Sequence, residues 1–261
     1  MPDAGAPTLG GVRARLEEPL ARHLPLRATT QTCGLWVEVA DEAELLAVIR
    51  AARADKLGLR ALAPWSDVMP PESGVTGAVI RLGRGFETLE DVPEGLRVGA
   101  SVPLALVGLR RGFEALAGAP GVVGEALDEG WLAPMVARTR RFKGRGPEEV
   151  EGAPAHDPKA LTLGAVLTRG AKLPWVPRAG QAFAPIKRKD LRATLSGLGL
   201  TGLRLGGAIL AEDDARVLIN RGEASPRQLR LLVQAVQERL KVATGIELEE
   251  RLVAPGRGGK L

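Results

Sequence analysis

The most constraining feature of the sequence is a long amphipathic segment near its C-terminal end. Ser225 is a favourable N-cap residue, and Pro226 suits the first turn of a helix. Apolar residues then recur at the spacing of one helix face: Leu229, Leu232, Val233, Val236 and Leu240. Gly245 stands where a glycine ends a helix in the left-handed conformation. The sequence therefore predicts a long helix whose apolar stripe needs a packing partner.

Strand patterns occur at both ends of the chain and supply such partners. Residues 35–40 alternate like a strand, Asp41 and Glu44 then form a capping-box pattern that starts a helix, and a second strand follows at 59–63. Further strands are predicted at 78–82, 96–100, 161–167, 203–210, 217–220 and 246–253, and further helices at 12–24 and 103–112. This mixture predicts the α+β class.

Length and charge restrict the number of domains and the kinds of partner. The 261 residues allow two modest domains, with a change of domain expected between residues 100 and 130. The net charge is +5, and basic residues gather at 138–145 and 187–192. Because aromatic residues make up only 3% and no recognition module is present, we interpret these clusters as solvated faces rather than a nucleic-acid site. An anionic nucleotide ligand would also fit them.

Cysteine usage and hydropathy bear on the cellular setting. Cys33 is the only cysteine, which excludes an intramolecular disulfide and a multi-cysteine metal site. A reducing compartment, the cytoplasm, is the expected setting. No run of about 18 apolar residues is present, so we expect neither a membrane span nor secretion. We assign no metal ligands.

Several segments in matching order resemble one known family. Residues 199–222, GLTGLRLGGAILAEDDARVLINRG, are followed by the helix and by GIELE, and Pro120-Gly121-Val122-Val123-Gly124 matches a Pro-Gly-x-Val-Gly segment. The front, LRATTQTCGLWVEVADEAELLAVIRAA, resembles the opening of the same family. Over about residues 26–256 the chain is similar to MurB proteins, the UDP-N-acetylenolpyruvoylglucosamine reductases.

The resemblance implies a MurB-like, two-part FAD-binding fold of the PCMH type with a shortened substrate domain. The expected divisions are a cap segment at 1–25, the first part of the FAD-binding domain at 26–115, the substrate domain at 116–222, the C-terminal helix and strand at 223–256, and a disordered tail at 257–261. The implied cofactor is FAD, and NADPH serves as reductant if the chain is active.

The resemblance also indicates which residues correspond to the flavin-binding segments of the family. Its Gly-x-Gly-Ser-Asn phosphate loop matches residues 64–67, Pro-Trp-Ser-Asp, in which only Ser66 is kept. Its second flavin segment matches Pro120, Gly121, Val123 and Gly124, with Glu125 where another glycine is usual. A proline removes an amide donor and a carboxylate repels phosphate, so these departures oppose flavin binding.

The positions that carry catalysis in the family also hold other residues. The serine that donates a proton to the substrate corresponds to Gln181, whose neutral amide is too weak an acid for that role. The supporting glutamate corresponds to Arg251, or to Glu250 if the alignment slips by one residue. The family's Tyr-Arg-x-Ser motif has no counterpart between residues 149 and 161.

These departures leave three hypotheses for the function. The first is a MurB relative without reductase activity that binds a UDP-sugar or a cell-wall synthesis protein. The second is a working, divergent UDP-N-acetylmuramate dehydrogenase in which Glu250 takes the place of the family's glutamate. The third, a nucleic-acid-binding surface, depends only on the two basic clusters and predicts steeply salt-dependent retention of DNA.

Overall fold

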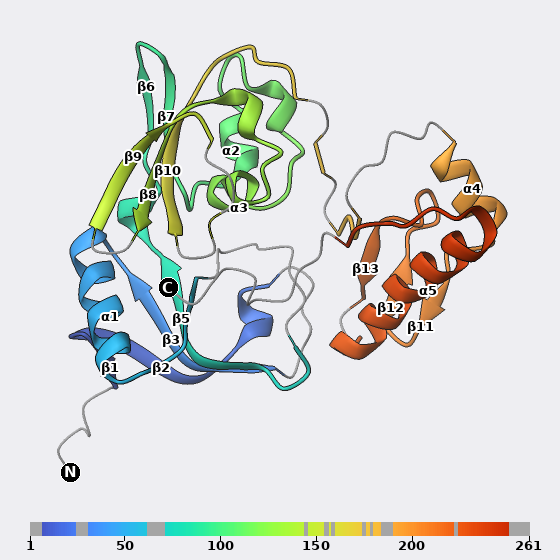
Figure 1. Ribbon diagram of the computed structural model, residues 1–261, viewed down its shortest axis with the longest axis horizontal. Helices are drawn as coiled ribbons and strands as arrows, with labels where there is room; N and C mark the ends of the chain where they lie inside the picture. The colour runs from blue at the N-terminus through green and yellow to red at the C-terminus, as the bar shows by residue number, and fades with distance from the viewer. Residues whose placement is uncertain are drawn as a thin grey trace.

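The computed structural model describes residues 7–24, 31–61, 71–143, 146–153, 157, 160–173, 176–177, 180–183, 190–221 and 224–250. Figure 1 shows two bodies, a larger one with elements β1 to β10 and a smaller one with the elements from α4 to α5. Helices and strands are interspersed along the chain, which confirms the α+β class. Within the described ranges, no helix is long and apolar enough to cross a membrane.

The first part of the larger body is a five-stranded sheet in the order β1-β2-β3-β5-β4. Its strands are β1 (Thr8–Leu9), β2 (Val12–Pro19), β3 (Thr32–Val39), β4 (Leu59–Ala61) and β5 (Val75–Leu82). Strands β3, β4 and β5 run parallel, whereas β1 and β2 are antiparallel to their neighbours. The strands predicted at 35–40, 59–63 and 78–82 are confirmed, although residues 62 and 63 lie outside the described part.

Helix α1 (Glu42–Ala54) connects β3 to β4 and covers one face of this sheet. Its start is the predicted one, because an Asp41 carboxylate oxygen accepts a hydrogen bond from the Glu44 amide at 2.9 Å. The Glu44 carboxylate in turn accepts from the Ala40 amide at 2.6 Å. Four side chains of the helix are buried against apolar residues of β3 and β5, namely Leu45, Val48, Ile49 and Ala52.

The helix predicted at residues 12–24 is wrong. This segment forms β2 and the short 3-10 helix η1 (Leu20–Arg22). Residues of β2 pair antiparallel with β3, from Ala14 opposite Val37 to Pro19 opposite Thr32. The apolar residues of the segment have near-helical spacing, but pairing with a distant strand satisfies the backbone and decides the conformation. The N-terminal segment therefore belongs to the first sheet.

The second part of the larger body is an antiparallel sheet in the order β6-β7-β10-β8-β9. Its strands are β6 (Leu89–Val92), β7 (Gly95–Gly99), β8 (Val136–Lys143), β9 (Gly146–Glu151) and β10 (Ala160–Leu167). Strands β7 and β10 confirm the predictions at 96–100 and 161–167. Strands β8 and β9 had no clear sequence signal, because their alternating arginines and glutamates stabilise each other across the pair instead of marking a core face.

Short helices cover one face of this second sheet, namely α2 (Leu104–Gly108), η3 (Glu114–Leu116), α3 (Val123–Asp128) and η4 (Ala133–Met135). The 3-10 helix η2 (Arg84–Phe86) lies at the opposite face, where Phe86 packs in one core with Phe142 and Leu163. Leu96 and Val98 of β7 pack with apolar residues of α2 and α3 in one buried core. Helix α2 is shorter than the predicted 103–112. A side chain at Gly108 would lie 2.2 Å from the Ala117 nitrogen, so the chain turns closely against η3 there.

The smaller body combines a three-stranded antiparallel sheet with two helices. Its elements are α4 (Leu191–Gly197), β11 (Arg204–Leu205), β12 (Ala208–Leu210), β13 (Leu218–Asn220) and α5 (Pro226–Thr244). The predicted α5 is confirmed with a full capping box between Ser225 and Gln228 and a left-handed Gly245 at φ 73°. The strand predicted at 203–210 is instead the hairpin of β11 and β12.

The strand predicted at 246–253 is also wrong over its described part. Residues 246–249 belong to no strand, and Glu250 forms one isolated antiparallel bridge with Phe183. Residues 251–253 and the expected tail at 257–261 lie outside the described residues.

The sheets and buried cores do not follow the domain boundaries predicted from the sequence. Residue 115 is the predicted end of the first part of the FAD-binding domain, but the second sheet contains strands from both sides of it, between residues 89 and 167. One apolar core joins Ala182 to Leu248 and includes Leu210 and Leu229, so residue 222 lies within a single packed unit. Strands β1 and β2 are part of the first sheet rather than a separate cap.

A buried carboxylate beside β2 stabilises the edge of the first sheet. The Glu18 carboxylate is only 4% exposed and accepts from Arg15 at 3.1 Å, while His23 Nε2 lies 3.0 Å away. The His23 ring stacks on Trp36 with a centroid distance of 3.8 Å. Burial alone would raise the pKa of Glu18, but the hydrogen bond with His23 and the charge of Arg15 outweigh it and lower that pKa. Burial lowers the pKa of His23, and Glu18 only partly opposes this effect.

This cluster predicts a loss of stability at acid pH. Both pKa values are lowered on folding, so the folded state binds fewer protons than the unfolded state and stability falls as pH decreases. The loss of stability from His23 begins as the pH falls below its unfolded pKa of about 6.5. The loss from Glu18 begins below its unfolded pKa of about 4.3. Urea unfolding at several pH values should show this decline. Glu18→Gln should remove the part of the decline that comes from Glu18 and steepen the part that comes from His23, because the Glu18 carboxylate opposes the lowering of the His23 pKa. The substitution should also destabilise the protein by about 1–3 kcal/mol at pH 7. The exposed neighbour substitution Glu17→Gln is the control. An unchanged pH profile in Glu18→Gln would contradict the assignment.

Candidate functional site

The glycine segment from Pro120 to Gly124 forms a tight turn that leads into α3. Gly121 adopts φ 79°, a left-handed conformation that side chains other than glycine adopt at a cost. Its carbonyl accepts a hydrogen bond from the Leu104 amide at 3.1 Å, and Pro103 bridges with Val122. The turn is thus fastened to the start of α2.

Both amides that follow this turn are used inside the protein. The Val123 amide donates to the Val102 carbonyl at 3.0 Å, and the Gly124 amide donates to the Ala100 carbonyl at 2.9 Å. A Cβ at position 124 would lie 3.0 Å from the Ala100 side chain. Close packing therefore explains this glycine without any ligand, and the segment offers fewer free donors than its sequence suggests.

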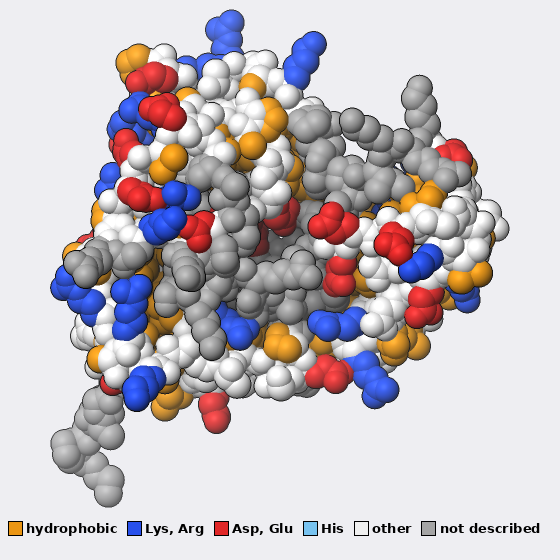
Figure 2. All heavy atoms as spheres, in the orientation of Figure 1, with side chains coloured by type: hydrophobic (Ala, Val, Ile, Leu, Met, Phe, Trp, Pro, Cys, Tyr) orange, Lys and Arg blue, Asp and Glu red, His pale blue; other side chains and the backbone are white. Residues whose placement is uncertain are grey.

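A carboxylate lies directly over the same turn. A Cβ at Gly121 would be 2.8 Å from Glu125 Oε2, so the Glu125 side chain folds back onto the glycine. The negative charge of Glu125 disfavours an anionic group that approaches the turn. Figure 2 shows the molecule hollowed between its two bodies, with acidic and basic side chains around the hollow.

The loop with Gln181 is attached to β13 of the smaller body. The Gly180 carbonyl accepts from the Leu218 amide at 2.7 Å, and the Ala182 amide donates to the Arg216 carbonyl at 2.8 Å. Two isolated bridges pair Gln181 with Val217 and Phe183 with Glu250. The structure therefore brings the segments of Gln181 and Glu250 together. Arg251 and Ser66 lie outside the described residues.

Gln181 is buried, and its side chain bonds to its own loop. Its Nε2 donates to the Phe183 carbonyl at 3.1 Å. A carboxamide does not ionise in the accessible pH range, so this position holds the loop and supplies no exchangeable acid for catalysis.

An ion pair next to this loop was missed by sequence reasoning. The Asp214 carboxylate is buried and receives two hydrogen bonds from the Arg216 guanidinium, at 2.8 and 2.7 Å. The hydrogen bond with Asp214 raises the pKa of Arg216. An acidic residue two positions before an arginine is common in sequences, so this spacing is only a weak signal for a buried ion pair. The pair rigidifies the backbone that accepts the Ala182 amide.

In the part of the chain that the structure describes, the cysteine and histidine side chains do not form a catalytic centre. Burial raises the pKa of the Cys33 thiol to about 11, so the reactive thiolate is disfavoured. His23 is committed to the Glu18 cluster, and His156 lies outside the described residues. Within the described ranges, no group of three or more His, Cys, Asp or Glu could hold a metal ion.

Comparison with known proteins identifies the lineage of this arrangement. The family model for the C-terminal domain of UDP-N-acetylenolpyruvoylglucosamine reductase matches residues 175–253, the smaller body. A UDP-N-acetylenolpyruvoylglucosamine reductase of Rhodospirillum rubrum is 30% identical over 264 residues, covering 83% of this chain and 82% of that protein. This chain belongs to the UDP-N-acetylenolpyruvoylglucosamine reductase, or MurB, family.

Other MurB proteins agree with this placement. A reductase of the same name from Heliobacterium modesticaldum is 27% identical over 297 residues, with 93% of this chain and 91% of that protein covered. The crystal structure of MurB from Thermus caldophilus matches the fold with a TM-score of 0.68 at 22% identity, covering 94% of this chain and 99% of that one. The MurB-like fold expected from the sequence is confirmed.

Proposed function

We propose that this MurB-family protein binds a UDP-sugar of peptidoglycan precursor synthesis without carrying out the family's reduction. The observation that carries the proposal is Gln181, which stands at the family's proton-donor position and whose amide is hydrogen-bonded to Phe183. A reductase must protonate the carbon next to the substrate carboxylate, and the described part of this loop offers no acid of suitable strength.

The glycine turn supports the same proposal. FAD carries a pyrophosphate with two negative charges, which backbone amides of glycine-rich turns normally bind. Here the Val123 and Gly124 amides already donate to backbone carbonyls, and the Glu125 carboxylate lies against Gly121. These residues do not fit an FAD bound through this turn, so no step of the proposed function uses FAD or NADPH.

A second candidate, an active but divergent reductase, is favoured by one contact. The bridge between Phe183 and Glu250 puts a carboxylate residue beside the loop that bears the proton donor in the family. If Glu250 supports catalysis in this way, replacing it should slow turnover by at least 100-fold, as loss of general acid-base groups usually does.

The two candidates differ in colour and turnover. Under the proposal, protein purified without added cofactor is colourless, does not oxidise NADPH with the enolpyruvyl UDP-sugar, and binds UDP-N-acetylglucosamine saturably in calorimetry. A yellow protein with one FAD per chain that turns over this substrate would overturn the proposal and establish the second candidate. In that case Glu250→Gln should lose activity, whereas the exposed neighbour substitution Glu249→Gln should keep it.

A further inference from the structure

A cavity of about 400 Å³ lies on the face of the second sheet that α2 and α3 do not cover. Leu96 and Val98 of β7 point into the core beneath those helices. Neighbouring residues of a strand point to opposite faces, so Arg97 points to the other face, where it lines the cavity. The cavity is therefore separated by the sheet from the Gly121–Gly124 turn.

Strand register gathers three arginines around this cavity. Val166 of β10 pairs with Arg97 on one side and with Arg138 on the other, so the two arginines flank it in one row. Adjacent strands are about 4.8 Å apart, which separates the two arginine backbones by about 10 Å. In the next row Gly164 pairs with Gly99 and with Arg140.

The floor between the arginines has little side-chain bulk. Gly99 and Gly164 are directly paired and carry no side chain, and Gly85 lines the cavity below them. A Cβ at Gly99 would lie 2.0 Å from the Phe86 carbonyl oxygen, so the backbone of η2 packs directly against this glycine and forms part of the cavity wall.

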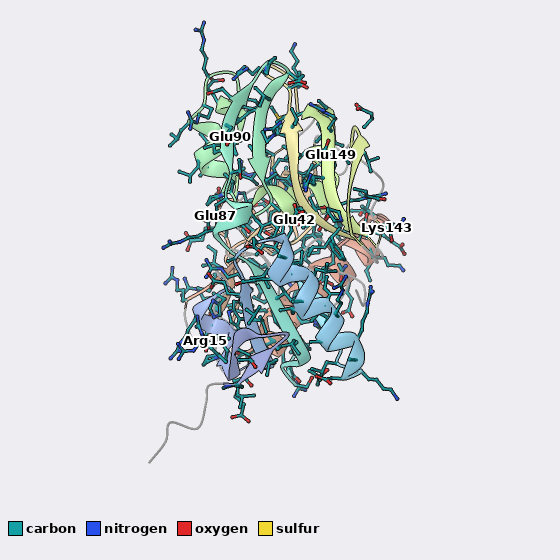
Figure 3. All side chains as sticks on the ribbon, turned by 90° about the vertical axis from the view of Figure 1, so that its left-hand side faces the viewer. Arg15, Glu42, Glu87, Glu90, Lys143 and Glu149 are labelled. Atoms are coloured by element: carbon teal, nitrogen blue, oxygen red, sulfur yellow. The ribbon has the colours of Figure 1, made fainter. Side chains whose placement is uncertain are left out.

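Two of the carboxylates that balance the arginines, those of Glu42 and Glu149, line the cavity together with them. Figure 3 shows Glu90 and Glu149 on opposite sides of this face and Glu42 at the start of α1. Arg97 contacts Glu90 at 3.5 Å and Arg138 contacts Glu94 at 2.9 Å. Both pairs are about half exposed, and such surface pairs contribute little stability. Their arginines can re-pair with a ligand at small cost.

Arg140 differs from the other two arginines. Two hydrogen bonds at 2.8 and 2.9 Å attach its guanidinium to the Glu42 carboxylate, and Glu149 lies 3.5 Å away. Arg140 therefore closes the end of the cavity towards α1, and Arg97 and Arg138 supply the exchangeable donors. Each guanidinium has five N–H groups in a planar fork that matches phosphate oxygens.

We propose that this cavity binds a phosphorylated small molecule whose phosphate contacts Arg97 and Arg138. The volume exceeds what one phosphate needs and lies in the range of small-ligand pockets. Two guanidiniums at one cavity suit a tetrahedral dianion that accepts several hydrogen bonds. The site is independent of the proposed UDP-sugar function, since its lining includes no residue of the Gln181 loop or of the Gly121–Gly124 turn.

Calorimetry with the full chain at low and physiological ionic strength tests the proposal. The probes are inorganic phosphate, glucose 1-phosphate and glucose. Glucose 1-phosphate should bind saturably, more weakly at higher salt, and glucose should not bind. A clear preference for the ester over inorganic phosphate supports an organic phosphate as the ligand. If inorganic phosphate binds as tightly as the ester, the organic part contributes nothing and the proposal is wrong.

Two substitutions and a matched control locate the site. Arg97→Gln and Arg138→Gln should each weaken glucose 1-phosphate binding by about tenfold or more, as loss of a charged hydrogen-bond donor does. The control is Arg169→Gln, because Arg169 is also paired to an acid of this sheet, Asp91, but does not line the cavity. Equal affinity in all variants, equal loss in the control, or no saturable binding in the wild type would overturn the proposal. Circular dichroism confirms that each variant is folded.

Discussion

Gly180→Ala is expected to disrupt the attachment of the candidate loop to the smaller body. Gly180 adopts φ 73°, and a Cβ there would lie 2.2 Å from the Leu218 carbonyl oxygen. The left-handed conformation alone costs a substituted residue about 1–2 kcal/mol. The clash is with backbone, which cannot rotate away as a side chain can, so the loop or β13 must move. We expect a total loss of about 3 kcal/mol or more.

The control for this prediction lies in the same body. Gly199 has φ 67°, but no described heavy atom lies within 4 Å of a Cβ built there. Gly199→Ala therefore isolates the conformational effect and should cost about 1–2 kcal/mol. Urea unfolding followed by far-UV circular dichroism measures both values. Equal losses in the two variants would show that the contact with Leu218 is not restrictive.

The largest packing effect is expected from α5. Leu229→Ala removes a fully buried side chain from the core between α5 and the strands of the smaller body. Large-to-small substitutions at such positions lose transfer free energy and leave a cavity, which together destabilise by about 2–5 kcal/mol. Because one core spans residues 182–248, the loop with Gln181 should also lose protection in amide hydrogen exchange.

Leu231 provides the matched control on the same helix. It is 43% exposed, so Leu231→Ala removes the same atoms from a site that solvent already contacts. Its effect on the free energy of unfolding should stay within about 0.5 kcal/mol. A destabilisation similar to that of Leu229→Ala would mean that the outer face of α5 is covered by another part of the protein.

Much of the candidate site could be predicted from residue identities. Gln181 at the proton-donor position excludes the family's acid whatever its surroundings, because a carboxamide has no suitable pKa. The structure adds that its segment lies beside that of Glu250. The state of the glycine turn could not be predicted, since the partners of the Val123 and Gly124 amides come from residues 100–102. The cavity of the second sheet was missed because its arginines come from two strands paired through a third.

The sequence by itself determined the elements with local signals. Helix α5 has its N-cap, first-turn proline, apolar stripe and terminal glycine within one continuous segment, and α1 has its own cap at Asp41. Only the tertiary structure decided that β2 is a strand, which residues pair around Val166, and that Glu125 lies over the Gly121 turn. The physical reason is that caps and periodicity depend on neighbours in the chain, whereas strand pairing and the use of backbone amides depend on residues far away in sequence.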